Sequence, residues 1–223
     1  MLKVALDIGH LYKRSNPQDK GAFYKQAYEG NLVYSYVKRA YELLSQEKDI
    51  EVYMSDPVKN ILVGDYWERR KWVNERFRAE DLYIQCHLNS GNGNYALVMC
   101  VLGFDVDDKV KKVRPIVPDE LVEIEKMYGQ VLALNTQKFL GLEVKDFDEA
   151  KDLVWSLKRG ERGYDIVKQF NCPAFVYEPC FIDNSYHFKN LLAGDWIEAI
   201  AKAIWQSCVE IRDKISYNKR TKN

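Results

Sequence analysis

Short apolar runs alternate with helical segments along this chain, and this alternation is the strongest constraint on its fold. Strands separated by helices predict a mostly parallel, twisted sheet with helices on both faces, which is an α/β fold. The predicted strands are residues 4–8, 50–54, 82–87, 95–102 (a central strand) and 174–178. The predicted helices are residues 31–46, 65–79, 118–140 and 195–215.

Three stretches carry weaker signals. Residues 8–30 are polar and contain glycine, and they predict a loop. Residues 105–117 are charged and indicate a loop or an edge excursion. Residues 141–171 predict one short helix, at 148–157, and then a turn punctuated by glycines.

The length of the chain fits one domain. Its 223 residues can bury one sizeable core, and no Gly-, Ser- or Pro-rich linker divides them. We therefore expect a catalytic domain over residues 1–213 and a basic tail over 214–223. Residues 212–223 carry five basic residues and one acid, which indicates a frayed, solvated tail; binding of a polyanion is the alternative.

Charge and composition restrict the partners. The 33 basic and 33 acidic residues cancel, so no electrostatic argument favours nucleic acid. No apolar run is long enough for membrane insertion. The N-terminus reads directly as a strand and shows no secretory signal, so the chain is made without one or the sequence omits it. Five cysteines without a Cys-x-x-Cys pair predict free, buried thiols.

Polar side chains stand where three predicted strands end. His10 follows the first run, His87 ends the run at 82–87, and Glu178 ends the run at 174–178. Ligands of open α/β sheets bind at the carboxyl ends of the strands, so we expect these side chains to face one crevice. Glu29 closes the loop that leads from the first strand to the first long helix.

These residue types suit a metal. A catalytic zinc has three protein ligands, and His10, Glu29 and His87 would supply two imidazoles and one carboxylate. The alternative for each histidine is a structural hydrogen bond. Cys86 precedes His87 and should point away from the site, because side chains alternate along a strand. His187 lies in a polar stretch, and we expect it at the surface.

Two acidic residues have alternative roles. Glu178 follows apolar residues, so partial burial should raise its pKa toward that of a general base. Alternatively, it pairs with Arg69, Arg70 or another nearby cation. Asp7 could orient His10, or it could serve hydrogen bonding in the core.

Four segments, taken in order, resemble one family. They are VALDIGH at 4–10, EGNL at 29–32, EDLYIQCHLNS at 80–90 and AFVYEPCFIDN at 174–184. Together they resemble the zinc-dependent N-acetylmuramoyl-L-alanine amidases, the amidase type 3 family of cell-wall hydrolases and phage endolysins. The likeness covers roughly residues 2 to 213.

The resemblance implies a site and a substrate. One zinc ion (Zn2+) would be bound by His10, Glu29 and His87, and Glu178 would be the catalytic residue. The substrate would be peptidoglycan, cut at the amide between the lactyl group of N-acetylmuramic acid and L-alanine. Asn89 and Ser90 follow His87 and could contact this substrate; turn formation is the alternative.

The chain departs from the family after His10 and after Glu178, and the stretch between His87 and the long helix also matches it poorly. Leu11 and Tyr12 follow His10 where the family often has two glycines, and Pro179 and Cys180 follow Glu178 in place of small residues. A zinc peptidase of the stem peptide and an inactive wall-binding homologue are the rival interpretations. The phage branch of the family implies release to the wall by a holin-type factor.

Overall fold

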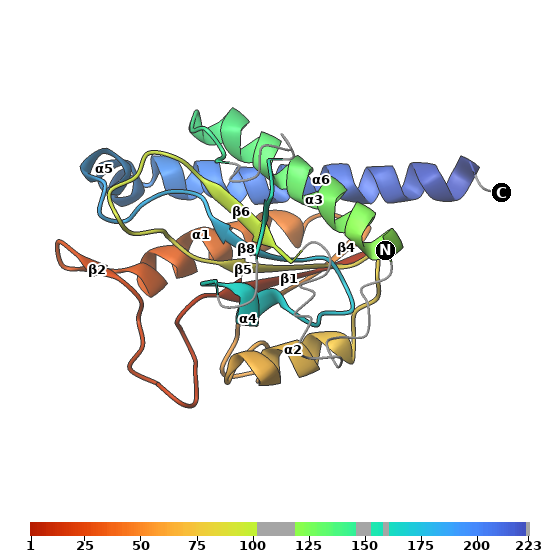
Figure 1. Ribbon diagram of the computed structural model, residues 1–223, viewed down its shortest axis with the longest axis horizontal. Coiled ribbons are helices and arrows are strands. Elements are labelled where there is room, and N and C mark those ends of the chain that lie inside the picture. Colours follow the sequence, from red (N-terminus) through yellow and green to blue (C-terminus); the bar gives the residue numbers. More distant parts are fainter. Residues whose placement is uncertain (102–118, 146–152, 158–160, 222–223) are drawn as a thin grey trace, which may run out of the picture.

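Six strands form one sheet at the centre of the molecule (Figure 1). The computed structural model describes residues 1–101, 119–145, 153–157 and 161–221. In spatial order the strands are β4 (Ile50–Met54), β1 (Leu2–Ile8), β5 (Leu82–Cys86), β8 (Ala174–Glu178), β6 (Leu97–Cys100) and β7 (Trp155–Ser156).

The sheet is mostly parallel, as predicted. β1 pairs in parallel with β4 and β5, and β5 pairs in parallel with β8. β6 lies between β8 and β7, so it is an interior strand as predicted, but it runs antiparallel to β8. An apolar run carries the same pattern in both directions, and its orientation therefore comes from the connections on either side.

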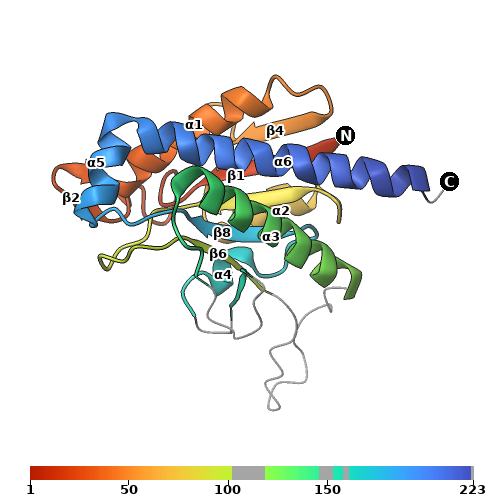
Figure 2. The same ribbon diagram turned by 90° about the horizontal axis from the view of Figure 1, so that it is seen from above.

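Helices cover both faces of the sheet, which confirms the predicted layers (Figures 1 and 2). One face packs against α1 (Glu29–Leu44), α3 (Asp119–Leu140) and α6 (Asp195–Thr221). The other packs against α2 (Tyr66–Asn74) and the short α4 (Tyr164–Val167). Side chains alternate accordingly along the strands: Leu6 joins the first core and Ala5 the second.

Helix α6 extends beyond its predicted end. Its predicted apolar stripe is buried at Ile200, Ile204, Cys208 and Ile211, where it packs on α1 and α3. The helix then continues past Ile215 to Thr221 and projects beyond the sheet (Figure 2). The described part of the predicted tail is therefore helical, and Lys214, Ser216, Tyr217, Asn218 and Thr221 are exposed.

Five short elements were not predicted, and one of them is α4, which lies in the predicted glycine-punctuated turn. The loop at 8–30 contains a small antiparallel hairpin, β2 (Phe23–Tyr24) and β3 (Ala27–Tyr28). Strand β7 replaces the end of the helix predicted at 148–157; residues 146–152 and the predicted loop at 105–117 lie outside the described residues. Helix α5 (Ser185–Ala193) begins at Asn184, whose side chain accepts hydrogen bonds from the amides of Tyr186 and His187.

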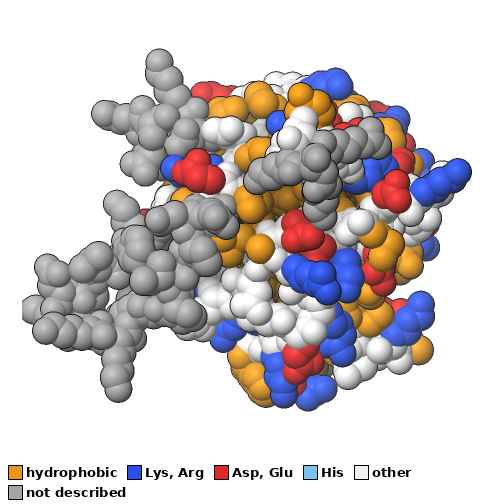
Figure 3. All heavy atoms as spheres, turned by 90° about the vertical axis from the view of Figure 1, so that its right-hand side faces the viewer, with side chains coloured by type: hydrophobic (Ala, Val, Ile, Leu, Met, Phe, Trp, Pro, Cys, Tyr) orange, Lys and Arg blue, Asp and Glu red, His pale blue; other side chains and the backbone are white. Residues whose placement is uncertain are grey.

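The surface carries both signs of charge. On the face shown in Figure 3, Lys and Arg side chains are interspersed with Asp and Glu side chains. Among the helices that the structure describes, none has both the length and the apolar character needed to cross a membrane.

A buried ion pair joins α2 to the sheet. Arg69 and Asp7 are both fully buried, and Arg69 Nη1 lies 2.5 Å from Asp7 Oδ1. Ser55 Oγ and Tyr83 OH also donate to Asp7, at 2.8 and 2.5 Å. Arg69 Nε donates to the carbonyl of Gly64 at 2.9 Å. Each charge is thus compensated in the core, which a buried charge requires.

We predict that Arg69→Met lowers the free energy of unfolding by about 3–5 kcal/mol, because it leaves the Asp7 carboxylate buried without its cation. Arg70→Met is the matched control. Within the described residues, Arg70 makes one long hydrogen bond, 3.3 Å to the carbonyl of Lys168, so its loss should cost less than about 1 kcal/mol. Urea denaturation measures both changes, and equal losses would contradict the prediction.

Candidate metal centre

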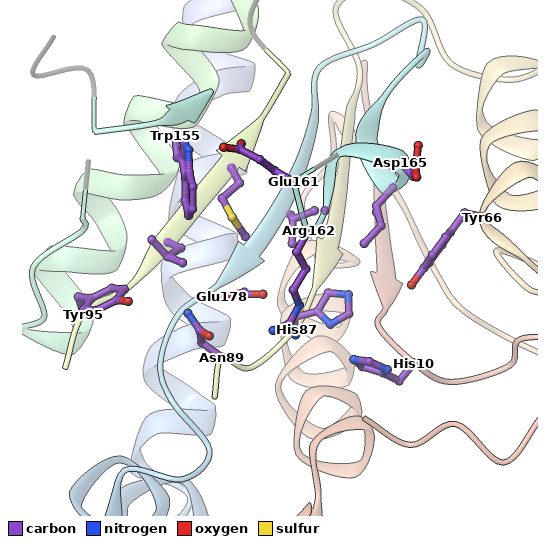
Figure 4. Close-up of a pocket in the computed structure, with 15 residues that line it drawn as sticks. His10, Tyr66, His87, Asn89, Tyr95, Trp155, Glu161, Arg162, Asp165 and Glu178 are labelled. Atoms are coloured by element: carbon purple, nitrogen blue, oxygen red, sulfur yellow. The ribbon is translucent and has the colours of Figure 1, made fainter. Parts of the chain in front are cut away.

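The predicted site residues meet at the carboxyl ends of three parallel strands (Figure 4). His10 follows β1, His87 follows β5, and Glu178 is the last residue of β8. Suitable ligand atoms of His10, Glu29 and His87 lie within 4.8 Å of one another. The structure therefore brings the three predicted ligands together.

Glu29 is the first residue of α1, and backbone amides hold its carboxylate in place. Oε1 accepts from the amide of Leu88 and Oε2 from that of Ala22, both at 3.0 Å. Its place at a helix N-terminus also favours a negative charge. Burial raises the pKa of Glu29, but the hydrogen bond and charge of His87 outweigh this effect and keep that pKa below its usual value. Glu29 thus offers an ionised carboxylate to both imidazoles.

His10 directs one ring nitrogen at Glu29 and the other away from it. Nδ1 lies 2.9 Å from Oδ1 of Asp19, a carboxylate that can only accept, so Nδ1 carries the proton. Nε2 then has a lone pair, and it lies 3.4 Å from Glu29 Oε2. Of all the buried side-chain nitrogen and oxygen atoms in the described residues, His10 Nε2 is the one that has no hydrogen-bond partner. Two facing acceptors leave room for a cation between them.

Asp19 is itself anchored. Lys13 Nζ donates to its Oδ2 at 2.6 Å, and the amide of Gly21 donates to its Oδ1 at 3.0 Å. Partial burial raises the pKa of Asp19, but the hydrogen bond from Lys13 outweighs this effect and lowers that pKa to about 2. Burial meanwhile lowers the pKa of His10, which favours the neutral imidazole that a metal binds.

His87 lies against the other oxygen of Glu29. Its Nδ1 is 3.0 Å from Glu29 Oε1, and its Nε2 is 3.0 Å from Gln85 Oε1. The rings of His10 and His87 meet edge to face, with their centroids 4.8 Å apart. Both imidazoles therefore converge on one carboxylate.

The backbone around the ligands leaves no room for larger residues. A Cβ on Gly9 would lie 2.4 Å from the His87 ring, and one on Gly21 would lie 2.6 Å from Glu29 Oε2. His10 itself has a φ of 68°, a conformation that costs a non-glycine residue free energy. This strained backbone conformation places the imidazole ring of His10 against Glu29.

Glu178 faces the same space and is buried (Figure 4). Burial raises the pKa of Glu178, and the nearby charges of His87 and Arg162 oppose that rise. Arg69 binds Asp7, and Arg70 binds the carbonyl of Lys168, so neither cation is engaged by Glu178. A carboxyl with a raised pKa is suited to accepting and returning a proton.

A cavity of about 490 Å³ opens beside His10, His87 and Glu178 (Figure 4). Hydrophobic and aromatic side chains from β6, β7 and α4 form much of its wall, and Arg162 and Asn89 add polar groups. Ser90 is not among the residues that line it. The lining residues are His10, Tyr66, His87, Asn89, Tyr95, Leu97, Met99, Trp155, Glu161, Arg162, Gly163, Asp165, Ile166, Val176 and Glu178.

The structure settles three secondary predictions. Cys86 points into the core beneath α1 and α6, as its alternation with His87 predicts. His187 is fully buried, so its predicted surface position is wrong. Its Nδ1 accepts from the amide of Phe181 at 3.0 Å, and its Nε2 lies 2.8 Å from Asn94 Oδ1. Asp7 serves core hydrogen bonding, and Asp19 contacts His10 instead.

Asp19, Gln85 and Arg162 were not identified from the sequence. Asp19 lies in a polar loop without periodicity, and Gln85 lies within a run that reads as strand interior. The signal that could have found Gln85 is its spacing, since residues two apart on a strand share a face. For Asp19 and Arg162 the sequence carries no comparable pattern.

Comparison with known proteins identifies the family. The model of the family Amidase_3, N-acetylmuramoyl-L-alanine amidase, matches residues 4–209. No curated protein sequence matches the chain.

Solved structures of amidases share its fold. An N-acetylmuramoyl-L-alanine amidase from Clostridium difficile 630 is 19% identical, with a TM-score of 0.68, over 95% of this chain and 97% of that one. Ami1 from Mycobacterium smegmatis is 15% identical, with a TM-score of 0.69, over 96% and 97%. The catalytic domain of CwlV from Bacillus (Paenibacillus) polymyxa var. colistinus is 17% identical, with a TM-score of 0.66, over 96% and 99%. With the family model matched along most of its length, the chain belongs to the Amidase_3 family of N-acetylmuramoyl-L-alanine amidases, hydrolases that act on peptidoglycan.

Proposed function

We propose that this chain uses one zinc ion, held by His10, Glu29 and His87, to hydrolyse the amide between the lactyl group of N-acetylmuramic acid and L-alanine. The observation that carries the proposal is the Nε2 atom of His10, which is buried, faces Glu29 and has no hydrogen-bond partner among the described residues. Two imidazoles and one carboxylate are the donor set of several catalytic zinc sites. The residues present therefore fit this metal.

When bound, zinc supplies a Lewis acid that polarises the scissile carbonyl and makes water reactive at neutral pH. The protein fixes where this happens. Asp19 orients His10, and the amides of Leu88 and Ala22 hold both oxygens of Glu29. The site is thus preorganised on the strand ends, and little reorganisation is needed at the moment of reaction.

Glu178 supplies the proton transfers in this proposal. Its carboxylate takes a proton from the attacking water and then returns it to the departing amine of L-alanine. The amine is a poor leaving group until it is protonated, so the same residue serves both halves of the reaction. Burial raises the pKa of Glu178 and makes its carboxylate a stronger base, which favours the first transfer.

The cavity offers a place for the substrate beside these groups. Asn89 lines it, and we propose that its side chain contacts the peptidoglycan substrate. Asn89 Oδ1 also accepts from the amide of Ser90 at 2.7 Å, which supports the turn at this position. A contact from Ser90 itself stays a prediction of the sequence, because Ser90 lies outside the lining.

We further propose that residues 1–213 form the catalytic domain and that 214–223 take no part in the reaction. The site draws on β1, α1, β5 and β8, all within this range. Action on the cell wall follows from the family. Delivery through a holin-type factor and the absence of nucleic-acid partners stay predictions of the sequence.

Glu178→Gln should abolish most activity and keep the metal. We expect one zinc per chain by metal analysis, and a rate of L-alanine N-terminus release from purified cell walls lowered by about 10²–10⁴-fold. Glu210→Gln, on α6 and away from the cavity, is the control and should behave as the wild type. Normal activity in Glu178→Gln would overturn its assigned role.

His87→Ala should lose both zinc and activity, because it removes one of three protein ligands. His187→Gln provides the control: this buried histidine lies outside the ligand set, so the variant should retain one zinc per chain. Stoichiometric zinc in His87→Ala would contradict the ligand assignment. Mass spectrometry of the digested walls separates the amidase from the rival peptidase, which would cut within the stem peptide, and from an inactive homologue, which would release nothing.

In the metal-free protein, Glu178→Gln should raise the free energy of unfolding at pH 7. Burial raises the pKa of Glu178 in the folded chain, so ionising it destabilises the fold. This cost is absent below the unfolded pKa, about 4.3, and grows as the pH rises through the higher folded value. Urea denaturation with a chelator, at pH 7 and pH 4, should show the advantage of glutamine at pH 7 alone. An equal difference at both pH values would contradict the prediction.

A further inference from the structure

Gln85 links the candidate metal centre to the buried ion pair of the core. It is fully buried in β5, two residues before His87. Its Nε2 donates to Asp7 Oδ2 at 2.9 Å, and its Oε1 lies 3.0 Å from His87 Nε2. One amide side chain therefore contacts Asp7 on one side and a predicted zinc ligand on the other.

Asp7 determines which way the amide of Gln85 points. The Asp7 carboxylate is paired with Arg69 and accepts further hydrogen bonds from Ser55 and Tyr83. A carboxylate in this position can only accept, so it requires the NH₂ end of Gln85. The carbonyl oxygen of Gln85 must then face His87.

The carbonyl oxygen in turn determines where His87 carries a proton. Because Oε1 of Gln85 can only accept, Nε2 of His87 must be the donor in their 3.0 Å contact. The other ring nitrogen, Nδ1, is the atom that lies 3.0 Å from Glu29 Oε1. That contact is satisfied by a second proton on His87 or by a cation between the two atoms, and Nε2 is protonated in both cases.

We propose that Gln85 is a positioning residue: held by Asp7, it keeps the proton of His87 on Nε2, so that His87 binds the metal through Nδ1. This inference rests on the proposed zinc site. His10 is arranged in the opposite sense, because Asp19 accepts from its Nδ1 and leaves its Nε2 for the metal. The two histidines thus present different nitrogens to one ion.

The two acceptors that hold the histidines differ in how they are supported. Asp19 is a partly exposed carboxylate that pairs with Lys13. Gln85 is neutral, and its orientation depends on the fully buried pair of Asp7 and Arg69. A neutral acceptor places no further negative charge in the core beside Asp7, where an additional carboxylate would be strongly disfavoured. Removing it would leave the Nε2–H of His87 buried without a partner.

Gln85→Leu tests the proposal, since leucine keeps much of the volume and removes both hydrogen bonds. Competition with a chromophoric chelator should show zinc affinity about 10- to 100-fold weaker than in the wild type. Ser55→Ala is the matched control: it also removes a donor to Asp7, at Oδ1, and Ser55 makes no hydrogen bond to Gln85 or His87 among those found in the described residues. Its affinity should stay within about 3-fold of the wild type.

Unchanged affinity in Gln85→Leu, or equal weakening in both variants, would overturn the proposal. A measurement on the wild-type chain covers the case in which Gln85→Leu does not fold. With ¹¹³Cd in place of zinc, the ¹⁵N spectrum of His87 should show the metal coupled to Nδ1 and a proton on Nε2. Coupling to Nε2 would overturn the proposal as well.

The same spectrum separates this inference from the zinc proposal. If the wild-type chain binds no stoichiometric metal, the proposed function fails. In the chelator-treated protein, His87 should still carry its Nε2 proton, because the hydrogen bond to Gln85 does not require the metal. An unprotonated Nε2 there would overturn the role of Gln85 alone.

Discussion

The buried carboxylate of Asp7 connects the core of this protein to its candidate metal centre. It pairs with Arg69 of α2, and it accepts from Ser55, Tyr83 and Gln85. Gln85, which Asp7 holds, contacts His87 in turn. A charge in the core is tolerated only when it is compensated, so the arrangement of donors around Asp7 is restricted. Through Gln85, these contacts also restrict the orientation of His87, a proposed zinc ligand that does not itself hydrogen-bond to Asp7 among the described contacts.

The site costs the fold stability at several points. His10 has a positive φ, Gly9 and Gly21 stand where no Cβ fits, and Glu178 is a buried carboxyl with a raised pKa. Such features persist where the surrounding structure determines them strongly, and they gather at functional sites. Here they surround the atoms that would hold one zinc ion and the residue that would move protons.

Much of this could be predicted from sequence, and the failures have physical causes. The layers, the family and the convergence of His10, Glu29, His87 and Glu178 follow from strand ends and from four matching segments. The direction of β6 did not follow, because an apolar run reads alike both ways. His187 was misplaced because Asn184 starts a helix in this polar stretch, and the helix turns His187 inward while Ser185 and Tyr186 stay exposed. Asp19 and Gln85 could not be identified from the sequence, because their roles depend on which atoms tertiary packing brings within hydrogen-bond distance.

The central claim is that His10, Glu29 and His87 hold one zinc ion, and anomalous diffraction from zinc-soaked crystals at the zinc absorption edge tests it most directly. The account predicts one strong peak at the carboxyl ends of β1, β5 and β8. It should lie about 2.0–2.1 Å from His10 Nε2 and His87 Nδ1, with a Glu29 oxygen at about 2.0–2.2 Å. A peak elsewhere, or no peak at this position, would contradict it.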